Sequence, residues 1–294
     1  MATNQTASAN EEAIGAWDGV LFDRFRKFRH IIVPALGAHG DEAMRLEPPA
    51  TGDRVLDIGC GFGDTTLQLA GRVGAGGSAL GVDAAPRFIE AAREEASEAG
   101  AQNVRFEVVD VEATSFDDQF DYAFSRFGTM FFANPVAALR NIREALVPGG
   151  RLCMVVWRQK LDNPWIHRAE TVVEGMVAEE EDSDELTCGP GPFSMANADA
   201  TSHVLLNAGF LDVTLRRCDI PIRIGRDLEE AAAYVMALGP AGEHIRLAGD
   251  EAQRRLPEIT AAVREALSEY QGEDGVRAGM STWIVSARSP AGPA

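Results

Sequence analysis

The chain has 294 residues with 46% hydrophobic content, which is enough to bury a large core in one domain with additions. A formal net charge of −18 argues against DNA or RNA as a partner, because an enzyme acting on nucleic acid is expected to present a basic face to the phosphates. No apolar run approaches the length of a helix that spans a bilayer, so we expect no membrane insertion.

The N-terminal segment is expected to be mostly helical. Residues 1–10 are small and polar, without the basic and apolar regions of a signal peptide, and they indicate a frayed tail. Residues 11–50 place apolar side chains at helical spacing. That stripe consists of Ile14, Trp17, Leu21, Phe25 and Phe28. The cationic cluster Arg24–His30 is interpreted as the polar side of this amphipathic helix rather than as a nucleic-acid patch.

The most informative segment is a glycine-rich turn between a short apolar strand and the start of a helix. Asp57 lies near the strand end, and the helix pattern begins at Asp64. The turn between them contains Gly59, Gly61 and Gly63. Glycine leaves the backbone open to a ligand, and a helix N-terminus adds oriented N–H groups and a partial positive charge. The turn therefore predicts a polar ligand, with a ligand-free turn as the structural alternative.

The glycine spacing helps to decide which ligand is expected. A dinucleotide site has the pattern G-x-G-x-x-G, and the position of its third glycine is occupied here by Asp64. An acidic side chain at that position would repel a pyrophosphate, whereas an amino-acid moiety tolerates it. Asp57 favours the same interpretation, because a carboxylate at that strand end can accept hydrogen bonds from an ammonium group.

Acidic and polar residues also follow the next strands along the chain. The apolar run Ala79–Asp83 ends in an acid twenty residues beyond Gly63, which is the length of one strand–helix–strand unit. Its carboxylate is placed to accept hydrogen bonds from both hydroxyls of a ribose. The run 104–109 ends at Asp110, and the run 120–124 ends at Ser125. Each acid taken singly has an ordinary strand-end residue as its alternative, but markers in this order at successive strand ends predict one ligand site.

The middle of the chain alternates strand and helix patterns five times over residues 51–158, which predicts a parallel sheet covered on both faces. The helices of this region are expected at about 64–72, 86–99 and 135–147, and a Pro-Gly-Gly sequence separates the third helix from the fifth strand at 152–157.

The rest of the chain, residues 159–294, is more mixed. A helix is expected over 164–180, and the acidic run 179–185 predicts a solvated, mobile loop. Further expected elements are helices near 197–208, 227–238 and 250–270, and strands at 212–218 and 281–287.

The D-x-G-x-G-x-G turn and the ordered strand-end acids resemble the class I S-adenosylmethionine (SAM)-dependent methyltransferases, in the branch similar to ubiquinone/menaquinone-biosynthesis enzymes (methyltransferase type 11/25). The resemblance is strong over residues 50–158 and weaker beyond. It implies a Rossmann-like, mostly parallel sheet of seven strands, the last inserted antiparallel between the fifth and sixth, with helices on both faces. It also implies three parts: residues 1–50 as a helical segment covering the cofactor site, 51–158 as the SAM-binding core, and 159–294 as the last two strands plus a helical substrate cap.

The same resemblance implies roles for individual residues. The cofactor contacts that it implies are Asp57, Gly59, Gly61, Gly63, Asp83, Ala84, Asp110, Val111 and Ser125. In this set Asp83 would bind the ribose and Asp110 the adenine amino group. The glycine turn would hold the methionine end, and the main chain at Ser125 would lie near it.

The expected chemistry follows from the sulfonium methyl group of SAM. It is already a strong electrophile, so the protein mainly has to hold a nucleophile in line at about 3 Å. An oxygen acceptor also needs a base, for which His167 is a candidate, with an ordinary structural histidine as the alternative. Arg126 is a candidate anchor for an acidic group of the acceptor, with a simple ion pair to a neighbouring acid as the alternative. The candidate substrate-pocket residues are Trp17, Phe22, Phe127, Met130, Phe131, Phe132 and Trp165.

These observations favour a methyltransferase acting at an O, N or C atom of a small, largely apolar acceptor. A methyltransferase acting on a protein or nucleic acid and a non-catalytic SAM-binding protein are the alternatives. A dehydrogenase is disfavoured by Asp64. The cysteines show no metal spacing and predict reduced thiols in a cytoplasmic protein without a metal site; they are Cys60, Cys153, Cys188 and Cys218. Monomer and homodimer both remain open.

Overall fold

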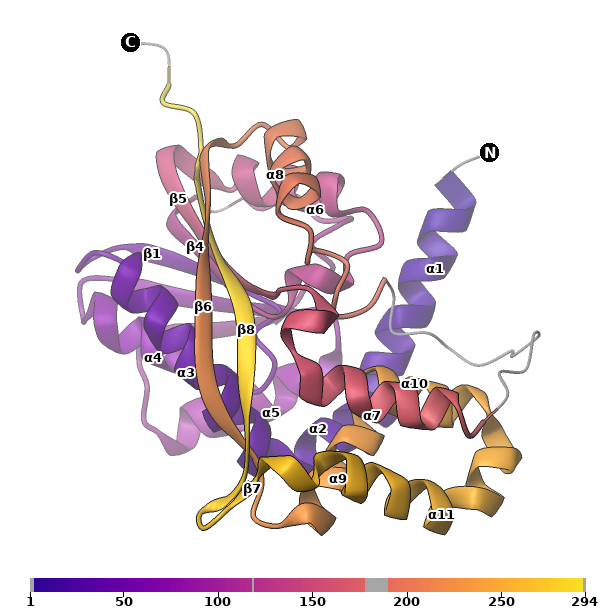
Figure 1. Ribbon diagram of the computed structural model, residues 1–294. Helices are drawn as coiled ribbons and strands as arrows, with labels where there is room; N and C mark the ends of the chain where they lie inside the picture. The colour runs from indigo at the N-terminus through magenta and orange to yellow at the C-terminus, as the bar shows by residue number, and fades with distance from the viewer. Residues whose placement is uncertain (1–2, 118, 178–189, 293–294) are drawn as a thin grey trace.

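The protein is built around one central β-sheet (Figure 1). The computed structural model describes residues 3–117, 119–177 and 190–292. The strand order is β3-β2-β1-β4-β5-β8-β6, and a short strand β7 pairs with β8. The strands are β1 (Arg54–Ile58), β2 (Ser78–Asp83), β3 (Val104–Val108), β4 (Phe120–Arg126), β5 (Leu146–Trp157), β6 (Leu211–Gly225), β7 (Gln271–Gly272) and β8 (Gly275–Arg288).

The directions of the strands confirm the expected Rossmann-like topology. Strands β1 to β5 pair in parallel, and β8 lies antiparallel between β5 and β6. The inner strands are buried on both faces, which is why they are almost continuously apolar; for example, Val55, Leu56 and Ile58 of β1 are at most 1% exposed. The sheet order reverses at β1, between β2 and β4. In open α/β sheets a ligand crevice forms at such a switch point, outside the carboxyl ends of the strands.

Helices cover both faces of the sheet, as expected. The connections from β1 through β2 to β3 run in one direction across the sheet, and the connection from β4 to β5 runs in the other. Because parallel crossovers are right-handed, the helices of these two sets lie on opposite faces. Helices α4 (Asp64–Val73) and α5 (Pro86–Glu98) lie on one face, where α3 (Arg29–Leu46) also packs. Helices α6 (Pro135–Glu144) and α8 (Ala198–Asn207) lie together on the other face.

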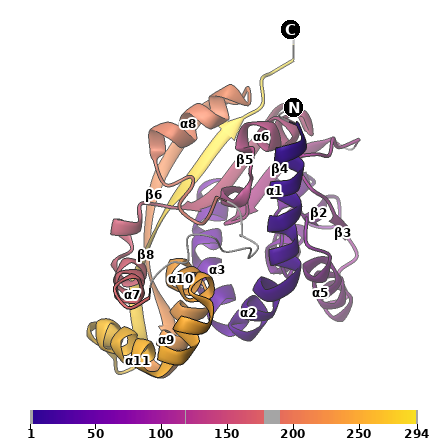
Figure 2. The same ribbon diagram turned by 90° about the vertical axis from the view of Figure 1, so that its right-hand side faces the viewer.

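The N-terminal region is helical from its third residue, so the expectation of a frayed tail is wrong over residues 3–10. Helix α1 (Thr3–Ala16) continues through a π-helical turn, η1 (Trp17–Leu21), into α2 (Phe22–Lys27). A kink separates α1 from α2, because Gly19 has the non-helical angles φ −106° and ψ −112°. Figure 2 shows these N-terminal helices between α5 and a second group of helices.

That second group of helices is held at the far end of two long strands. Strands β6 and β8 run beyond the rest of the sheet towards α7, α9, α10 and α11 (Figure 1). These helices span α7 (Pro164–Glu174), α9 (Leu228–Ala237), α10 (Pro240–Leu247) and α11 (Gly249–Leu267). We call them the cap helices. Three short 3-10 turns complete the described elements: η2 (Thr129–Phe131), η3 (Lys160–Asp162) and η4 (Ser268–Tyr270).

Several expected boundaries need correction. The helix expected over 135–147 ends at Glu144, because strand β5 already begins at Leu146, which pairs with Phe120 before the Pro-Gly-Gly irregularity. The helix expected over 164–180 ends at Glu174. Strands β6 and β8 are about twice as long as expected, since their outer parts pair with each other rather than with the parallel core. The acidic run 179–185 lies outside the described residues.

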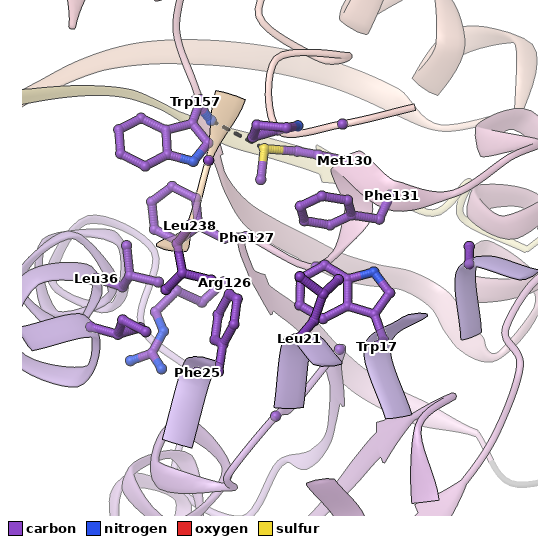
Figure 3. Close-up of a pocket in the computed structure, with 18 of the residues that line it drawn as sticks. Trp17, Leu21, Phe25, Leu36, Arg126, Phe127, Met130, Phe131, Trp157 and Leu238 are labelled. Carbon is purple, nitrogen blue, oxygen red and sulfur yellow. Dashed lines mark hydrogen bonds between the residues drawn. The ribbon is translucent and has the colours of Figure 1, made fainter. Parts of the chain in front are cut away.

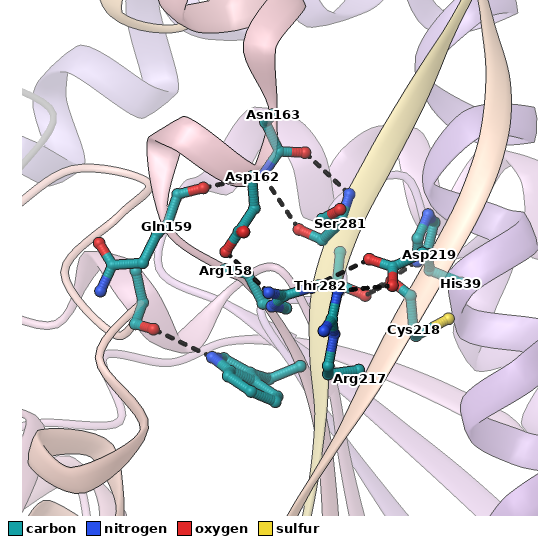
Figure 4. A network of polar contacts seen from close by, with 12 residues as sticks. His39, Arg158, Gln159, Asp162, Asn163, Arg217, Cys218, Asp219, Ser281 and Thr282 are labelled. Atoms are coloured by element: carbon teal, nitrogen blue, oxygen red, sulfur yellow. Dashed lines mark hydrogen bonds and ion pairs between the residues drawn. The ribbon is translucent and has the colours of Figure 1, made fainter.

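A polar network joins the start of α7 to strands β6 and β8 (Figure 4). Arg158, whose side chain is 8% exposed, pairs with Asp162 at 2.9 Å and with Asp219 at 3.0 Å. The side-chain amide of Asn163 donates to the backbone carbonyl of Ser281 at 3.1 Å, and its oxygen accepts from the Ser281 backbone N–H at 2.8 Å. The two Asn163 bonds are buried, and together with the Arg158 ion pairs they join the start of α7 to the sheet.

Three findings complete the description of the chain. The cysteines of the described residues, Cys60, Cys153 and Cys218, are buried free thiols, and Cys188 lies outside that part. Within the same part of the chain, His, Cys, Asp and Glu side chains form no group of three that could hold a metal ion. None of the described helices combines the length and apolar character needed to cross a membrane.

Candidate active site

A cavity of about 770 Å³ opens at the carboxyl ends of the parallel strands. Its wall is shared by the glycine turn, the N-terminal helices and the cap helices, and its volume is in the range of small-ligand sites. Figure 3 shows the aromatic part of this wall. The residues expected in the site that line the cavity are Trp17, Gly59, Gly61, Asp83, Ala84, Asp110, Val111, Arg126, Phe127, Met130, Phe131, Phe132 and Trp165.

The glycine turn has the left-handed backbone that its sequence predicts, with φ values of 65°, 53° and 80° at Gly59, Gly61 and Gly63. A Cβ at Gly59 would lie 2.9 Å from Cα of Gly128, and a Cβ at Gly63 would lie 2.8 Å from the ring of Phe106. At Gly61 the nearest atom would be 3.9 Å away. The outer glycines therefore permit close packing of the turn, while the backbone of Gly61 stays open to the cavity.

Asp83 at the end of β2 connects the turn to the cavity. One carboxylate oxygen accepts from the Gly61 backbone N–H at 3.0 Å, and the other accepts from the Ala85 N–H at 3.0 Å. Burial raises the pKa of Asp83 above its usual value, and these backbone hydrogen bonds oppose that shift. Each oxygen has a second lone pair, so the carboxylate can still accept the two hydroxyls of a ribose.

Asp110 follows β3 on the same edge of the sheet. Its carboxylate accepts from the backbone N–H of Glu112 at 2.9 Å and from the side-chain amide of Asn10 on α1. The second contact brings α1 to the edge of the cavity. Glu112 also lines the cavity, and it accepts from the backbone N–H groups of Ala133 and Asn134 at 2.8 and 2.6 Å.

Three expected cofactor residues support the turn from behind and do not line the cavity. Asp57 accepts a hydrogen bond of 2.6 Å from the Thr66 hydroxyl, and burial raises its pKa to about 7. The Ser125 hydroxyl donates to the carbonyl of Ile58 at 2.8 Å. Gly63 begins α4 against the neighbouring helix α5. The side chains of Asp57 and Ser125 therefore point away from the cavity.

Two expected acceptor-side residues also lie outside the cavity wall. Phe22 packs against Phe88 and Phe62, at ring-centroid distances of 4.9 and 5.8 Å. His167 projects from α7 with its side chain 44% exposed, and its Nδ1 lies 3.9 Å from Oε2 of Glu170. The α7 residues that line the cavity are Trp165, Ile166, Ala169 and Glu170, which share one face of the helix, and position 167 lies beyond the edge of that face.

Arg126 lines the cavity at the end of β4. Its guanidinium lies 2.9 Å from a carboxylate oxygen of Asp64, and its side chain is 12% exposed. Of the two interpretations drawn from the sequence, the ion pair with a neighbouring acid is the one present. Asp64 lies in the first turn of α4, and Arg126 at the end of β4 is its ion-pair partner.

The acceptor side of the cavity is aromatic. Ring-centroid distances of 5.3, 6.4 and 6.4 Å join Phe127 to Trp157, Trp157 to Trp165, and Trp165 to Tyr234. We call these four residues the aromatic row. On the N-terminal side, Trp17 meets Phe131 edge-on at 4.8 Å (Figure 3). Phe127 has a left-handed backbone with φ 61°, a strained conformation that is concentrated at functional sites.

The cavity also contains polar residues that the sequence did not single out. They are Asn10, Arg24, Glu112, Lys160, Glu170, Glu243 and His244. A signal existed for Glu170, because it occupies the apolar face of α7 at helical spacing from Ile166 and Val173. No comparable pattern marked Lys160 or His244, whose positions depend on how the cap helices pack.

A family model described as a methyltransferase domain matches residues 49–201, which is more than half of the chain. The chain therefore belongs to this family, the class I SAM-dependent methyltransferases of the ubiquinone/menaquinone-like type. The cofactor of these proteins is SAM. The residues present fit it, because the carboxylates of Asp83 and Asp110 and the open backbone at Gly61 lie in one wall.

Two curated relatives are similar to part of this chain. Aklanonic acid methyltransferase DauC from Streptomyces sp. strain C5 is 39% identical over 114 residues, covering 38% of this chain and 52% of the relative. Ubiquinone/menaquinone biosynthesis C-methyltransferase UbiE from Azotobacter vinelandii is 39% identical over 114 residues, covering 38% of this chain and 45% of the relative. The matches thus span about half the length of these curated relatives.

The structure is also similar to the crystal structure of YcgJ from Bacillus subtilis. That comparison gives a TM-score of 0.53 at 17% identity and covers 87% of this chain and 98% of that chain. It shows the shared Rossmann-like fold.

Proposed function

We propose that the protein transfers the methyl group of SAM to a small, largely apolar organic acceptor at an O, N or C atom. One observation carries this proposal: strand-end carboxylates and an aromatic row line the same cavity. The names of the two curated relatives, which describe methylation of aklanonic acid and C-methylation in ubiquinone/menaquinone biosynthesis, support a small acceptor.

The proposed roles divide along the cavity wall. Asp83 accepts hydrogen bonds from the ribose, Asp110 binds the adenine edge, and the backbone at Gly61 approaches the ligand closely. The cofactor supplies an electrophilic methyl group, so this chain has to position the acceptor and exclude water. Phe127 and Trp157 provide flat apolar surfaces for that purpose. Ser125, Gly63 and Asp57 act behind the turn, where they hold its shape.

Charge and access favour a small molecule over a macromolecule. The net charge of −18 opposes binding of nucleic acid. The N-terminal helices and the cap helices both contribute to the cavity wall, which favours a ligand that enters the cavity over a chain bound along an open sheet edge.

The proposal is tested first by calorimetry. We expect SAM and S-adenosylhomocysteine to bind, and NAD not to bind. The methyl-labelled cofactor is then incubated with the enzyme and a cell extract, and products are separated by size and identified by mass spectrometry. Label in the small-molecule fraction is the expected result. Label in protein or nucleic acid would overturn the acceptor class, binding without any labelled product would favour a non-catalytic protein, and NAD binding without SAM binding would refute the cofactor.

A further inference from the structure

Three ionisable side chains meet in the cavity wall where the cap helices close it. Nζ of Lys160 in η3 lies 2.6 Å from Oε1 of Glu170 in α7, and Nε2 of His244 in α10 lies 3.7 Å from the same oxygen. All three residues line the cavity. We call them the Lys160–Glu170–His244 cluster. None of them takes part in the cofactor contacts described above.

Glu170 and His244 are the more buried members of the cluster. The side chains of Glu170 and His244 are only 7% and 15% exposed. Glu170 shares its face of α7 with Ile166 and Val173, which are buried core residues. Burial of a carboxylate is costly even when it is paired, and a large apolar side chain would serve packing better at this position. Its presence therefore points to a polar ligand rather than to stability.

Glu170 also has the capacity to accept another hydrogen bond. An ionised carboxylate offers about four acceptor positions on its two oxygens. Lys160 binds Oε1, whereas Oε2 lies 3.9 Å from Nδ1 of His167, which is longer than a hydrogen bond. A donor entering from the cavity can occupy such a position without displacing Lys160.

The charge of the cluster limits what that donor can be. The charges of Lys160 and Glu170 cancel each other. An anionic ligand group would be repelled by the Glu170 carboxylate, and this pair has no further positive charge to offset that repulsion. A neutral hydroxyl suits the pair better, because it donates to the carboxylate and accepts from the ammonium group.

The position of the cluster defines the length of the ligand. The aromatic row runs from Phe127 at the end of β4 to Trp165 and Tyr234, whose rings are nearly parallel at 18°. Glu170 lies five residues beyond Trp165 on α7, which is about 7.5 Å along the helix. A flat molecule of more than one ring is needed to contact the row and reach the cluster.

We propose that the Lys160–Glu170–His244 cluster is a specificity site that binds a hydroxyl group of a multi-ring aromatic acceptor. This inference rests on the proposed function, and it names the acceptor class. Glu170 accepts the hydrogen bond of the hydroxyl, and Lys160 holds the carboxylate and donates to the hydroxyl oxygen. A site that hydrogen-bonds a hydroxyl strongly rejects an analogue without it, because its buried polar groups are then left without that partner.

The test compares three probes of the same ring size in the presence of S-adenosylhomocysteine: naphthalene, 2-naphthol and 2-naphthoate. Binding is measured by calorimetry and by fluorescence of the cavity tryptophans. We expect the wild-type protein to bind 2-naphthol about ten-fold or more tightly than naphthalene, and more tightly than 2-naphthoate. In Glu170→Leu the advantage of 2-naphthol over naphthalene should fall to about two-fold or less, with unchanged affinity for S-adenosylhomocysteine.

Two further variants keep the test decisive. Glu174→Leu removes an acid from the same helix that also lies 3.7 Å from His244 but does not line the cavity, so it should retain the preference for 2-naphthol. If Glu170→Leu does not fold, Lys160→Met, at the edge of the cluster where the side chain is 36% exposed, removes the donor to the hydroxyl oxygen and should reduce the preference for 2-naphthol; an unreduced preference there would count against the hydroxyl site.

The outcomes separate this inference from the proposed function. Equal binding of naphthalene and 2-naphthol, a hydroxyl preference that survives in Glu170→Leu, or tighter binding of 2-naphthoate would each overturn the hydroxyl site. If S-adenosylhomocysteine still binds in those cases, the proposed function stands without it. Failure of S-adenosylhomocysteine to bind would instead overturn the proposed function.

Discussion

Replacement of His39 by asparagine tests whether a buried, uncharged histidine makes the fold sensitive to acid. His39 is fully buried on α3, and its Nδ1 lies 2.9 Å from the hydroxyl oxygen of Thr282 (Figure 4). The Thr282 hydroxyl donates to the carbonyl of Cys218 at 3.3 Å, so Nδ1 is assigned as the N–H that donates to Thr282. Nε2 then has a lone pair and no hydrogen-bond partner within the described residues. A proton there would be buried without an acceptor.

The expected magnitude follows from the pKa of this histidine. Burial lowers the pKa of His39 from 6.5 to about 4. One pKa unit corresponds to about 1.36 kcal/mol, so the difference between 6.5 and about 4 corresponds to about 3 kcal/mol of unfolding free energy. Above pH 6.5 both the folded and the unfolded histidine are neutral, and the fold loses nothing. As the pH falls towards 4, only the unfolded chain takes up the proton, and the free energy of unfolding decreases by up to that amount.

Denaturant unfolding of the wild-type protein and of His39→Asn, at several pH values between about 7.5 and 4, measures this effect. Asparagine retains an N–H group for Thr282, and its smaller volume leaves a cavity whose cost does not depend on pH. The wild-type protein should therefore lose about 3 kcal/mol more than the variant on acidification. His203→Asn removes an exposed histidine from α8 and serves as the control. A difference in unfolding free energy between wild type and His39→Asn that stays constant with pH would refute the reasoning.

The remaining predictions concern the turn and its neighbouring acid. Asp83→Asn should weaken SAM binding in calorimetry by about 1–3 kcal/mol, because the amide offers one acceptor oxygen where the carboxylate offers two. Asp250→Asn, at an exposed position, is the control. Equal SAM affinities of Asp83→Asn and the wild-type protein would remove Asp83 from the ribose site. Gly63→Ala should lower the thermal unfolding midpoint more than Gly74→Ala does. Both glycines have positive φ, but only the Cβ at position 63 would approach the Phe106 ring, at 2.8 Å, so equal losses would contradict the packing argument.

Much of the cofactor half of the site could be predicted from local sequence. Asp83 and Asp110 lie on the cavity because a parallel strand brings its C-terminal residue to a known edge of the sheet. The same rule misplaced the side chain of Asp57. In the strand register Asp57 pairs with Gly81, two positions before Asp83, so its side chain lies below the edge of the sheet, where it accepts from Thr66 behind the turn.

The sequence by itself determined the strand–helix alternation, the glycine turn and the acids at the strand ends, because each of these depends on residues close together in the chain. Only the tertiary structure decided the acceptor side. Glu170 meets His244 across 74 positions, and His39 meets Thr282 across 243. Helical periodicity states which face of α7 or α3 is buried, but it does not state which distant strand or helix covers that face. Those contacts depend on how β6 and β8 extend beyond the sheet and carry the cap helices over the cavity.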